Sequence, residues 1–182
     1  MRILVISDTH GSLGKAFDVW EKLRNIDLVI HCGDHKEDAE TLEKLWRVPV
    51  VAVKGNCDGF GPAEEAIAST PAGEIFVTHG HGHGVDYGLE ELAEAAKDRG
   101  CAIACFGHTH VPVVEYVDDV CCVNPGSLPR PKDGKNGSVA VITAEENGDF
   151  YANIVYYDTI CGGGQRTRGG HLRDILNYSD GQ

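Results

Sequence analysis

The sequence predicts a mixed α/β domain in which two packed β-sheets are flanked by helices. Residues 1–58 alternate buried-strand patterns with helical patterns, which is typical of parallel strands joined by right-handed crossovers. The second half contains strand patterns paired around short turns, which indicate antiparallel hairpins and a second sheet packed on the first. At 182 residues the chain has room for one such domain with a full core.

Three strands and two helices are expected in the first part of the chain. Continuous aliphatic runs predict strands that are buried on both faces, at Ile3–Ile6, Leu28–Cys32 and Val50–Val53. Apolar residues at helical spacing predict the intervening helices, at about 13–24 and at 37–46. Each strand is followed by glycine together with Asp, Asn or His. In open α/β sheets, ligands bind at the carboxyl ends of the strands, so these polar residues are candidates for a site.

The remaining elements are expected mainly as hairpins. Strand patterns flank turn residues in three predicted hairpins, at 66–70 with 74–78, at 113–117 with 120–123, and at 138–143 with 150–157. A helix is predicted at 88–98, followed by a buried strand at 102–106. We expect a single domain over residues 1–160, and then a glycine-rich break with a short helix at 171–178 in the tail 161–182.

The amino-acid composition argues against several classes of protein. The net charge of −12 argues against a protein that follows the phosphate backbone of duplex nucleic acid, which needs a basic surface. The seven cysteines, an odd number lying mainly on apolar runs, favour buried thiols in a reducing cytosol over a disulfide framework. No apolar run approaches the length of a membrane span, and the first residues are too short a run for a signal peptide. We therefore expect a cytoplasmic protein with no membrane partner.

Seven candidate metal ligands follow the predicted strands, and one edge of a sheet could gather them: Asp8, His10, Asp34, Asn56, His79, His108 and His110. They suffice for two divalent cations if Asp34 bridges both. Mixed oxygen and nitrogen ligands suit Mn, Fe, Zn, Co or Ni better than Mg or Ca. On an extended backbone His108 and His110 would face the same way, which suggests that both serve one ion. Each Asp or Asn alone could instead cap a helix or stabilise a turn.

Five motifs in order carry a family resemblance: Asp8-Thr9-His10, Gly33-Asp34, Gly55-Asn56-Cys57-Asp58, Thr78-His79-Gly80-His81 and Gly107-His108-Thr109-His110. With these motifs the chain resembles the calcineurin-like metallophosphoesterase superfamily, and within it the small phosphodiesterases of the YfcE/MJ0936 type. The resemblance implies a four-layer α-β-β-α sandwich. It also implies hydrolysis of small phosphodiesters by in-line attack of a hydroxide that bridges two metal ions, with manganese as the first expectation and nickel, iron, cobalt or zinc as alternatives. Homodimers are common among such relatives.

The resemblance divides the ligands between two positions. One ion would be held by Asp8, His10, Asp34 and His110, and the other by Asp34, Asn56, His79 and His108. This separates His108 from His110, against the expectation from strand alternation. The residues expected to act on substrate are Asn56, Cys57, Asp58 and His81. Many family members carry His where this chain has Cys57, so His81 is an alternative donor of the proton to the leaving group.

Other residues are expected to have supporting roles. His31 lies within a strand and is expected in the core, while His35 and His83 are expected in exposed or glycine-rich loops. Arg130 and Lys132 could contact substrate phosphate, although a solvated loop is the commoner situation. Two alternative functions stay open. One is a nuclease of the same fold, which the acidic charge disfavours, and the other is a protein-binding scaffold resembling the retromer subunit.

Overall fold

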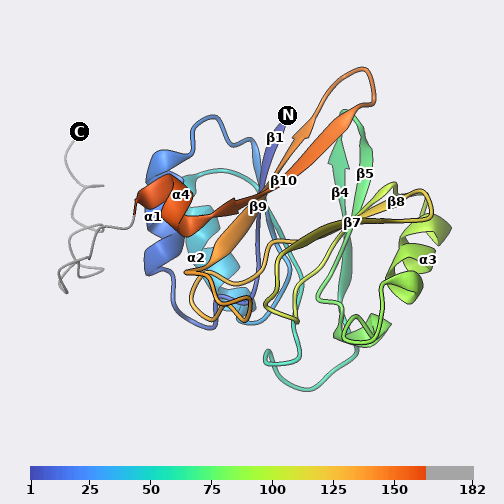
Figure 1. Cartoon of the computed structure of the whole chain (residues 1–182), viewed down its shortest axis with the longest axis horizontal. Helices are drawn as coiled ribbons and strands as arrows, with labels where there is room; N and C mark the ends of the chain where they lie inside the picture. The colour runs from blue at the N-terminus through green and yellow to red at the C-terminus, as the bar shows by residue number, and fades with distance from the viewer. Residues whose placement is uncertain (163–182) are drawn as a thin grey trace.

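The structure, a computed structural model, describes residues 1–162 and consists of two β-sheets packed face to face between layers of helices (Figure 1). Four α-helices and one short 3₁₀ helix are present in these residues: α1 Gly14–Lys22, α2 Lys36–Trp46, η1 His81–His83, α3 Glu90–Asp98 and α4 Tyr157–Cys161. Figure 1 shows α1, α2 and α4 on one side of the sheets and α3 on the other. The order of layers is therefore helices, sheet, sheet, helix.

The first sheet has five strands in the order β10-β9-β1-β2-β3. Their bounds are β1 Arg2–Ile6, β2 Leu28–His31, β3 Val50–Ala52, β9 Ser138–Ala144 and β10 Phe150–Tyr156. β1, β2 and β3 are parallel, and β9 adds antiparallel to the free edge of β1. The three parallel strands therefore end at the same edge, as the sequence predicts.

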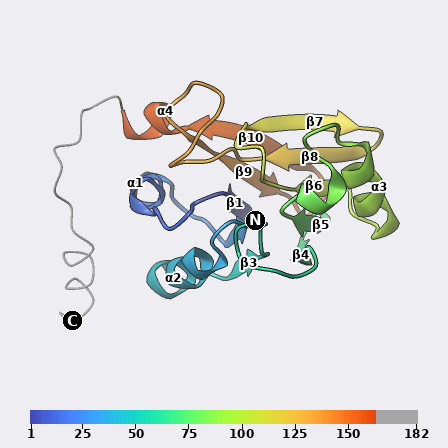
Figure 2. The same ribbon diagram turned by 90° about the horizontal axis from the view of Figure 1, so that it is seen from below.

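The second sheet also has five strands, in the order β4-β5-β6-β8-β7. Their bounds are β4 Glu65–Thr70, β5 Gly73–Thr78, β6 Ile103–Cys105, β7 Val113–Val117 and β8 Val120–Asn124. β5, β6 and β8 run parallel, while β4 and β7 close the edges as antiparallel hairpin partners. Figure 2, turned by 90°, shows the two sheets as separate layers, with α3 covering the second.

Three apolar clusters hold the layers together. The largest lies between the sheets and includes Ile3, Ile30, Ile75 and Val123, all fully or almost fully buried. A second lies under α1, α2 and α4, and a third lies under α3. Alternate residues of the same strands enter different clusters, because successive side chains of a strand point to opposite faces.

The predicted fold class is confirmed, but the assignment of strands to sheets differs from expectation. The hairpin β9–β10 returns to the first sheet, and the second sheet begins at Glu65 and contains parallel pairs. The sequence predicts a strand through residue 157 and no helix directly after it, whereas α4 occupies Tyr157–Cys161. The helix expected at 171–178 lies outside the described residues. Every helix within residues 1–162 is too short or too polar to span a bilayer.

Candidate functional site

The candidate ligands lie on loops that leave strands of both sheets. Asp8 and His10 follow β1, Asp34 follows β2, and Asn56 follows β3. From the second sheet, His79 follows β5 directly, and His108 and His110 follow β6. The site therefore lies where the carboxyl ends of the two sheets meet, rather than on one sheet alone.

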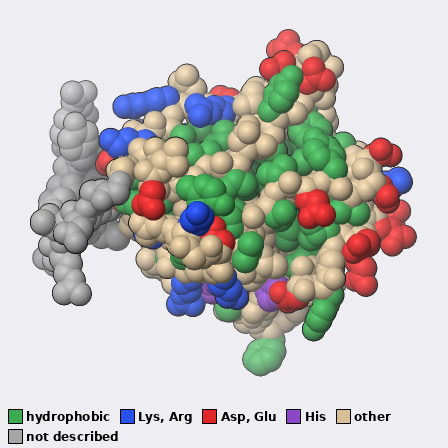
Figure 3. All heavy atoms as spheres, viewed as in Figure 1, with side chains coloured by type: hydrophobic (Ala, Val, Ile, Leu, Met, Phe, Trp, Pro, Cys, Tyr) green, Lys and Arg blue, Asp and Glu red, His purple; other side chains and the backbone are tan. Residues whose placement is uncertain are grey.

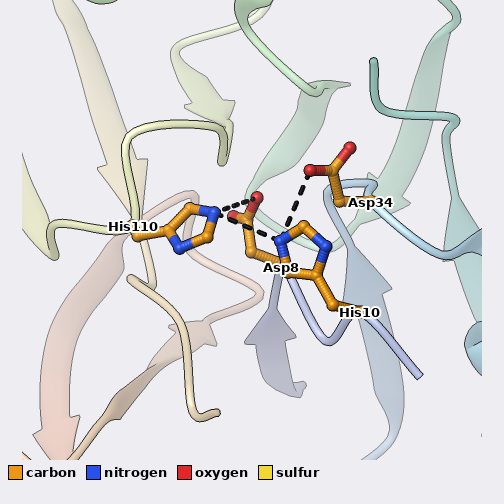
Figure 4. Close-up of side chains that lie close together, drawn as sticks. All are labelled: Asp8, His10, Asp34 and His110. Atoms are coloured by element: carbon orange, nitrogen blue, oxygen red, sulfur yellow. Dashed lines mark hydrogen bonds and ion pairs between the residues drawn. The ribbon is translucent and has the colours of Figure 1, made fainter. Parts of the chain in front are cut away.

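Four side chains form a compact cluster, shown in Figure 4. Asp8, His10, Asp34 and His110 each offer a ligand atom, and these atoms lie within 4.8 Å of one another. His110 Nε2 lies 3.3 Å from Asp8 Oδ1 and 3.3 Å from His10 Nε2, while His10 Nε2 lies 3.5 Å from Asp34 Oδ2. Three of the four residues are buried and His10 is partly buried. This is the first ligand set that the family resemblance implies.

A second group of side chains, formed by Asp34, Asn56, His79 and His108, shares Asp34 with the first cluster. The other carboxylate oxygen, Asp34 Oδ1, lies 3.3 Å from His79 Nε2. The Asn56 side-chain oxygen lies 3.0 Å from His79 Nε2 and 2.9 Å from His108 Nδ1. Asp34 thus presents one oxygen to each group. His108 and His110 belong to different groups of side chains, as the family resemblance implies. Strand alternation predicts instead that they share one group.

The outer nitrogens of three histidines have acceptor partners. His79 Nδ1 lies 2.7 Å from the Cys32 carbonyl oxygen, and His110 Nδ1 lies 2.7 Å from the Arg130 carbonyl oxygen. His108 Nε2 lies 2.9 Å from the Asp86 carboxylate. Because these partners can only accept, each outer nitrogen must carry a hydrogen and donate it. In the neutral imidazole, the inner nitrogen then has a lone pair and no hydrogen.

These inner lone pairs face other acceptors. His79 Nε2 and His108 Nδ1 face the oxygen of Asn56, and His110 Nε2 faces Asp8 Oδ1, which is buried and has no hydrogen-bond partner. Two hydrogen-bond acceptors that face each other repel, and burying a carboxylate oxygen without a hydrogen-bond partner costs free energy. A cation bound between these atoms would replace this repulsion with coordination. The donor chemistry therefore fits divalent metal ions, held by histidines whose outer N–H is fixed by a hydrogen bond, as metal-binding histidines commonly are.

The backbone at the site adopts an uncommon conformation. Positive φ angles occur at five candidate ligands, namely Asp8 (55°), His10 (46°), Asp34 (57°), His108 (69°) and His110 (60°). A non-glycine residue in this region costs about 1–2 kcal/mol, and such residues cluster at functional sites. It also explains why alternation fails for His108 and His110, since neither continues the extended strand.

Two glycines allow loops to approach the site closely. A Cβ atom on Gly55 would lie 2.1 Å from Asp34 Oδ1, and a Cβ on Gly107 would lie 1.9 Å from Ser7 Oγ. Backbone therefore packs directly against the carboxylate-bearing loops at both positions. Glycine is the residue that permits this approach.

The electrostatics of the site favour charged carboxylates. Burial alone would raise the pKa of Asp34, but hydrogen bonds from Cys57 and the nearby His79 and His10 outweigh it, so the pKa is lowered. Contact with Asp8 raises the pKa of His110. Burial, followed by the positive charge of Arg130, lowers the pKa of His10. The lowered pKa of Asp34 keeps its carboxylate ionised, which is the form that binds a metal.

The residues predicted to act on substrate have different surroundings. The Cys57 N–H donates to Asp34 Oδ1 at 3.0 Å. Partial burial and a hydrogen bond to Asp34 raise the pKa of the Cys57 thiol to about 11. The His81 ring lies near those of His79 and His108, and burial followed by these two rings lowers its pKa. Asp58 accepts hydrogen bonds from the backbone N–H groups of residues 35, 36 and 55.

The other histidines lie around the site. His31 is fully buried, as expected, and its Nε2 lies 2.9 Å from the Thr9 hydroxyl between the two carboxylate loops. His35 pairs with Asp38 and is half exposed. His83 lies in η1, and its Nε2 lies 3.2 Å from Glu65 Oε1, so it contacts β4 rather than lying free on a glycine-rich loop.

Sequence reasoning missed the groups that orient the histidines. Asp86 lies in the segment between η1 and α3, where no pattern distinguishes it from a solvated residue. The Cys32 and Arg130 contacts use main-chain carbonyls, which any residue type supplies. Only the fold brings these acceptors to the outer nitrogens.

Comparison with known proteins identifies the family of this chain. Residues 1–147 match the calcineurin-like phosphoesterase superfamily domain. The chain is 34% identical over 160 residues to "Probable metallophosphoesterase YsnB" of Bacillus subtilis, covering 87% of this chain and 91% of that protein. It is 34% identical over 146 residues to "Phosphodiesterase MJ0936" of Methanocaldococcus jannaschii, covering 69% and 83%.

A solved structure shows the same fold. The crystal structure of a conserved uncharacterized protein, described as a predicted phosphoesterase, from Streptococcus pneumoniae TIGR4 superposes with a TM-score of 0.69 at 26% identity. The alignment covers 86% of this chain and 90% of that one. The family model, the relatives and the solved structure thus agree on the family of this chain. The chain belongs to the calcineurin-like phosphoesterase superfamily, a family of hydrolases.

Proposed function

We propose that this protein is a phosphodiesterase that uses two divalent metal ions to hydrolyse small phosphodiesters. One observation carries the proposal. The ring nitrogens of His79, His108 and His110 that point into the site face oxygen acceptors at 2.9–3.3 Å. The relatives with named activity add support, since MJ0936 is a phosphodiesterase by name.

The ligand sets follow from the two groups of side chains. One ion would be held by Asp8, His10, Asp34 and His110, and the other by Asp34, Asn56, His79 and His108. Asp34 would bridge, because its two oxygens point to different sets. When bound, such a pair activates water and stabilises the charge that develops on the phosphoryl oxygens. Manganese is our first candidate, with nickel, iron, cobalt or zinc as alternatives, because the set mixes carboxylate and imidazole.

Other residues would act on the substrate. The Asn56 side-chain amide borders the hollow above the ligand sets, where it can also meet a phosphoryl oxygen. Cys57 borders the same hollow, and the raised pKa keeps its thiol protonated at neutral pH, so it can hold a proton for the leaving group. His81 lines the adjacent cavity and is the alternative donor. For Asp58 we propose a positioning role, because both of its carboxylate oxygens accept backbone N–H groups.

Metal loading tests the proposal. Protein treated with chelator and then loaded with Mn²⁺ is expected to bind about two ions per chain and to hydrolyse bis-p-nitrophenyl phosphate only after loading. Elemental analysis and the release of p-nitrophenolate measure the two quantities. Protein that binds no Mn²⁺ or Ni²⁺ would instead indicate a protein-binding scaffold. Efficient cleavage of single-stranded DNA would favour the nuclease, which the charge of −12 opposes.

The proton donor can be tested at Cys57. Replacing Cys57 with His is expected to raise the rate on alkyl phosphodiesters about tenfold relative to aryl ones, because alkoxide leaving groups need a proton and p-nitrophenolate does not. Rates are compared on matched alkyl and aryl diesters, with Cys57→Ser as the control for side-chain size. If the alkyl-to-aryl ratio is the same in the His variant and in the unaltered protein, Cys57 is not at the donor position.

The cellular setting is also a proposal. All seven cysteines are free, and four of them lie in the strands or strand ends of the core at Cys32, Cys105, Cys121 and Cys122. Buried free thiols suit a reducing compartment. This supports the expected cytoplasmic location.

A further inference from the structure

A hollow of about 510 Å³ lies over the candidate ligands, and its lining includes Arg130, Pro131 and Lys132. The remaining lining residues are candidate ligands together with Cys57, namely His10, Asp34, Asn56, Cys57, His108 and His110. Apart from the candidate ligands, the charged side chains that line this hollow are thus both positive. Figure 3 shows Lys or Arg side chains beside histidines at the lower edge of the face in view.

These two cations have no side-chain partner among residues 1–162. Elsewhere in that part of the chain, Lys36 and Lys54 pair with Glu64, and Arg99 pairs with Glu65. Within the described residues, the Arg130 guanidinium and the Lys132 ammonium take part in no ion pair or hydrogen bond, and only the backbone groups of these two residues are bonded. Lys44 and Lys97 also lack an ion pair within residues 1–162, but Arg130 and Lys132 differ from them because both line the hollow over the candidate ligands. They are available to an anion.

The loop that carries the two cations is fixed from two sides. Lys15 Nζ donates to the carbonyl oxygens of Leu128 at 3.1 Å and Asn136 at 2.6 Å, which ties both ends of the loop to α1. The Arg130 carbonyl accepts from His110 Nδ1 at 2.7 Å, and the Lys132 N–H donates to the His110 carbonyl at 3.1 Å. The backbone of residues 130–132 is therefore held against the site, so its side chains start from fixed positions. Pre-organisation of this kind lowers the entropic cost of binding.

Charge balance indicates what these cations would bind. In the proposed site, the four positive charges of two divalent cations would be matched by Asp8, Asp34, a hydroxide nucleophile and the single charge of a phosphodiester. Asp86, a further carboxylate near the site, already accepts a hydrogen bond from His108. Asp34 is the only carboxylate in the lining of the hollow, so a diester with neutral arms leaves Arg130 and Lys132 without a further counter-charge in that lining. A second anionic group on the substrate supplies one.

We propose that Arg130 and Lys132 form an anion subsite, so that the preferred substrates are phosphodiesters with a carboxylate or phosphate on one arm. The inference rests on the proposed phosphodiesterase function and specifies its substrate class. Guanidinium and ammonium groups bind both kinds of anion through charge-assisted hydrogen bonds. A cationic arm, such as choline, would be repelled.

Four p-nitrophenyl diesters with one common leaving group test the subsite. Their second alcohols are ethanol, choline, 3-hydroxypropionate and ethanediol monophosphate. In the unaltered protein, kcat/KM is expected to be about tenfold higher for each anionic arm than for ethyl, and lower for choline. The double variant Arg130→Gln/Lys132→Gln is expected to lose this preference, while Arg130→Lys/Lys132→Arg retains most of it. The control Lys44→Gln/Lys97→Gln removes two exposed charges on α2 and α3, away from the lining of the hollow, and should retain the full preference.

Binding gives a readout that does not depend on hydrolysis. With equal Mn²⁺ present, calorimetry compares phosphonoacetate, which carries a second anion, with ethylphosphonate, which does not. The unaltered protein is expected to bind phosphonoacetate about tenfold more tightly, and Arg130→Gln/Lys132→Gln to lose that difference. Equal ratios in the two proteins would overturn the subsite. Failure of all four diesters to react would count against the phosphodiesterase, while the calorimetric ratio would still decide the subsite.

Discussion

Replacing Asp34 with Asn is expected to lower phosphodiesterase activity by about a thousandfold or more and to weaken the binding of both metal ions. Loss of a residue that only orients a ligand already costs roughly 10–100-fold, and Asp34 would contact both ions directly. Its two oxygens face different histidines, His10 at 3.5 Å and His79 at 3.3 Å. Asn removes the negative charge and replaces one oxygen with an NH₂ group, which cannot coordinate a cation.

The measurement combines activity, metal content and stability. Asn has nearly the shape of Asp and its NH₂ can donate to a histidine, so we expect the thermal midpoint to stay within a few degrees while the metal content falls. Asp119→Asn, in the exposed turn between β7 and β8, is the matched control and should change none of the three quantities. An Asp34→Asn variant that retained two ions and full activity would show that Asp34 does not bridge.

Removal of His108 and removal of His110 are each expected to empty a different metal position. Each single Ala variant should bind about one Mn²⁺ per chain instead of about two, and should lose about a hundredfold or more in activity, since both ions take part. The reason is geometric: His108 Nδ1 lies 2.9 Å from Asn56, whereas His110 Nε2 lies 3.3 Å from Asp8.

Double variants distinguish this division from a general loss of histidines. His10→Ala/His110→Ala removes two ligands of the same set and is expected to retain one ion. His108→Ala/His110→Ala removes one ligand of each set and is expected to retain none. Both remove two imidazoles, so each is the control for the other. Equal metal contents would contradict the division of ligands.

The fold class and the three ligand-bearing loops of the first sheet could be predicted from the sequence, because both depend on local patterns. Buried aliphatic runs identify β1, β2 and β3, and the polar residues that follow them lie at the same edge once the strands are parallel. Hydrophobic pattern does not specify which sheet a hairpin joins, so it could not be predicted that β9 pairs with β1 and brings β10 into the first sheet. Their side chains satisfy the same pattern in either sheet.

The finer geometry of the site depends on backbone conformation and on distant contacts. His108 and His110 have φ angles of 69° and 60°, which residue type alone does not indicate for histidine. Asp86 meets His108 across 22 positions of sequence, and the carbonyl groups behind His79 and His110 carry no sequence signal at all. Residue identity therefore predicted the ligands, and the fold supplied what orients them.

The central claim, a pair of metal ions bridged by Asp34, is tested most directly by anomalous diffraction from crystals grown with Mn²⁺. Two anomalous peaks are expected, one among Asp8, His10, Asp34 and His110, and the other among Asp34, Asn56, His79 and His108. Their separation should be about 3.5–4 Å, as in other paired metal sites. A single peak, or peaks away from these side chains, would contradict the account.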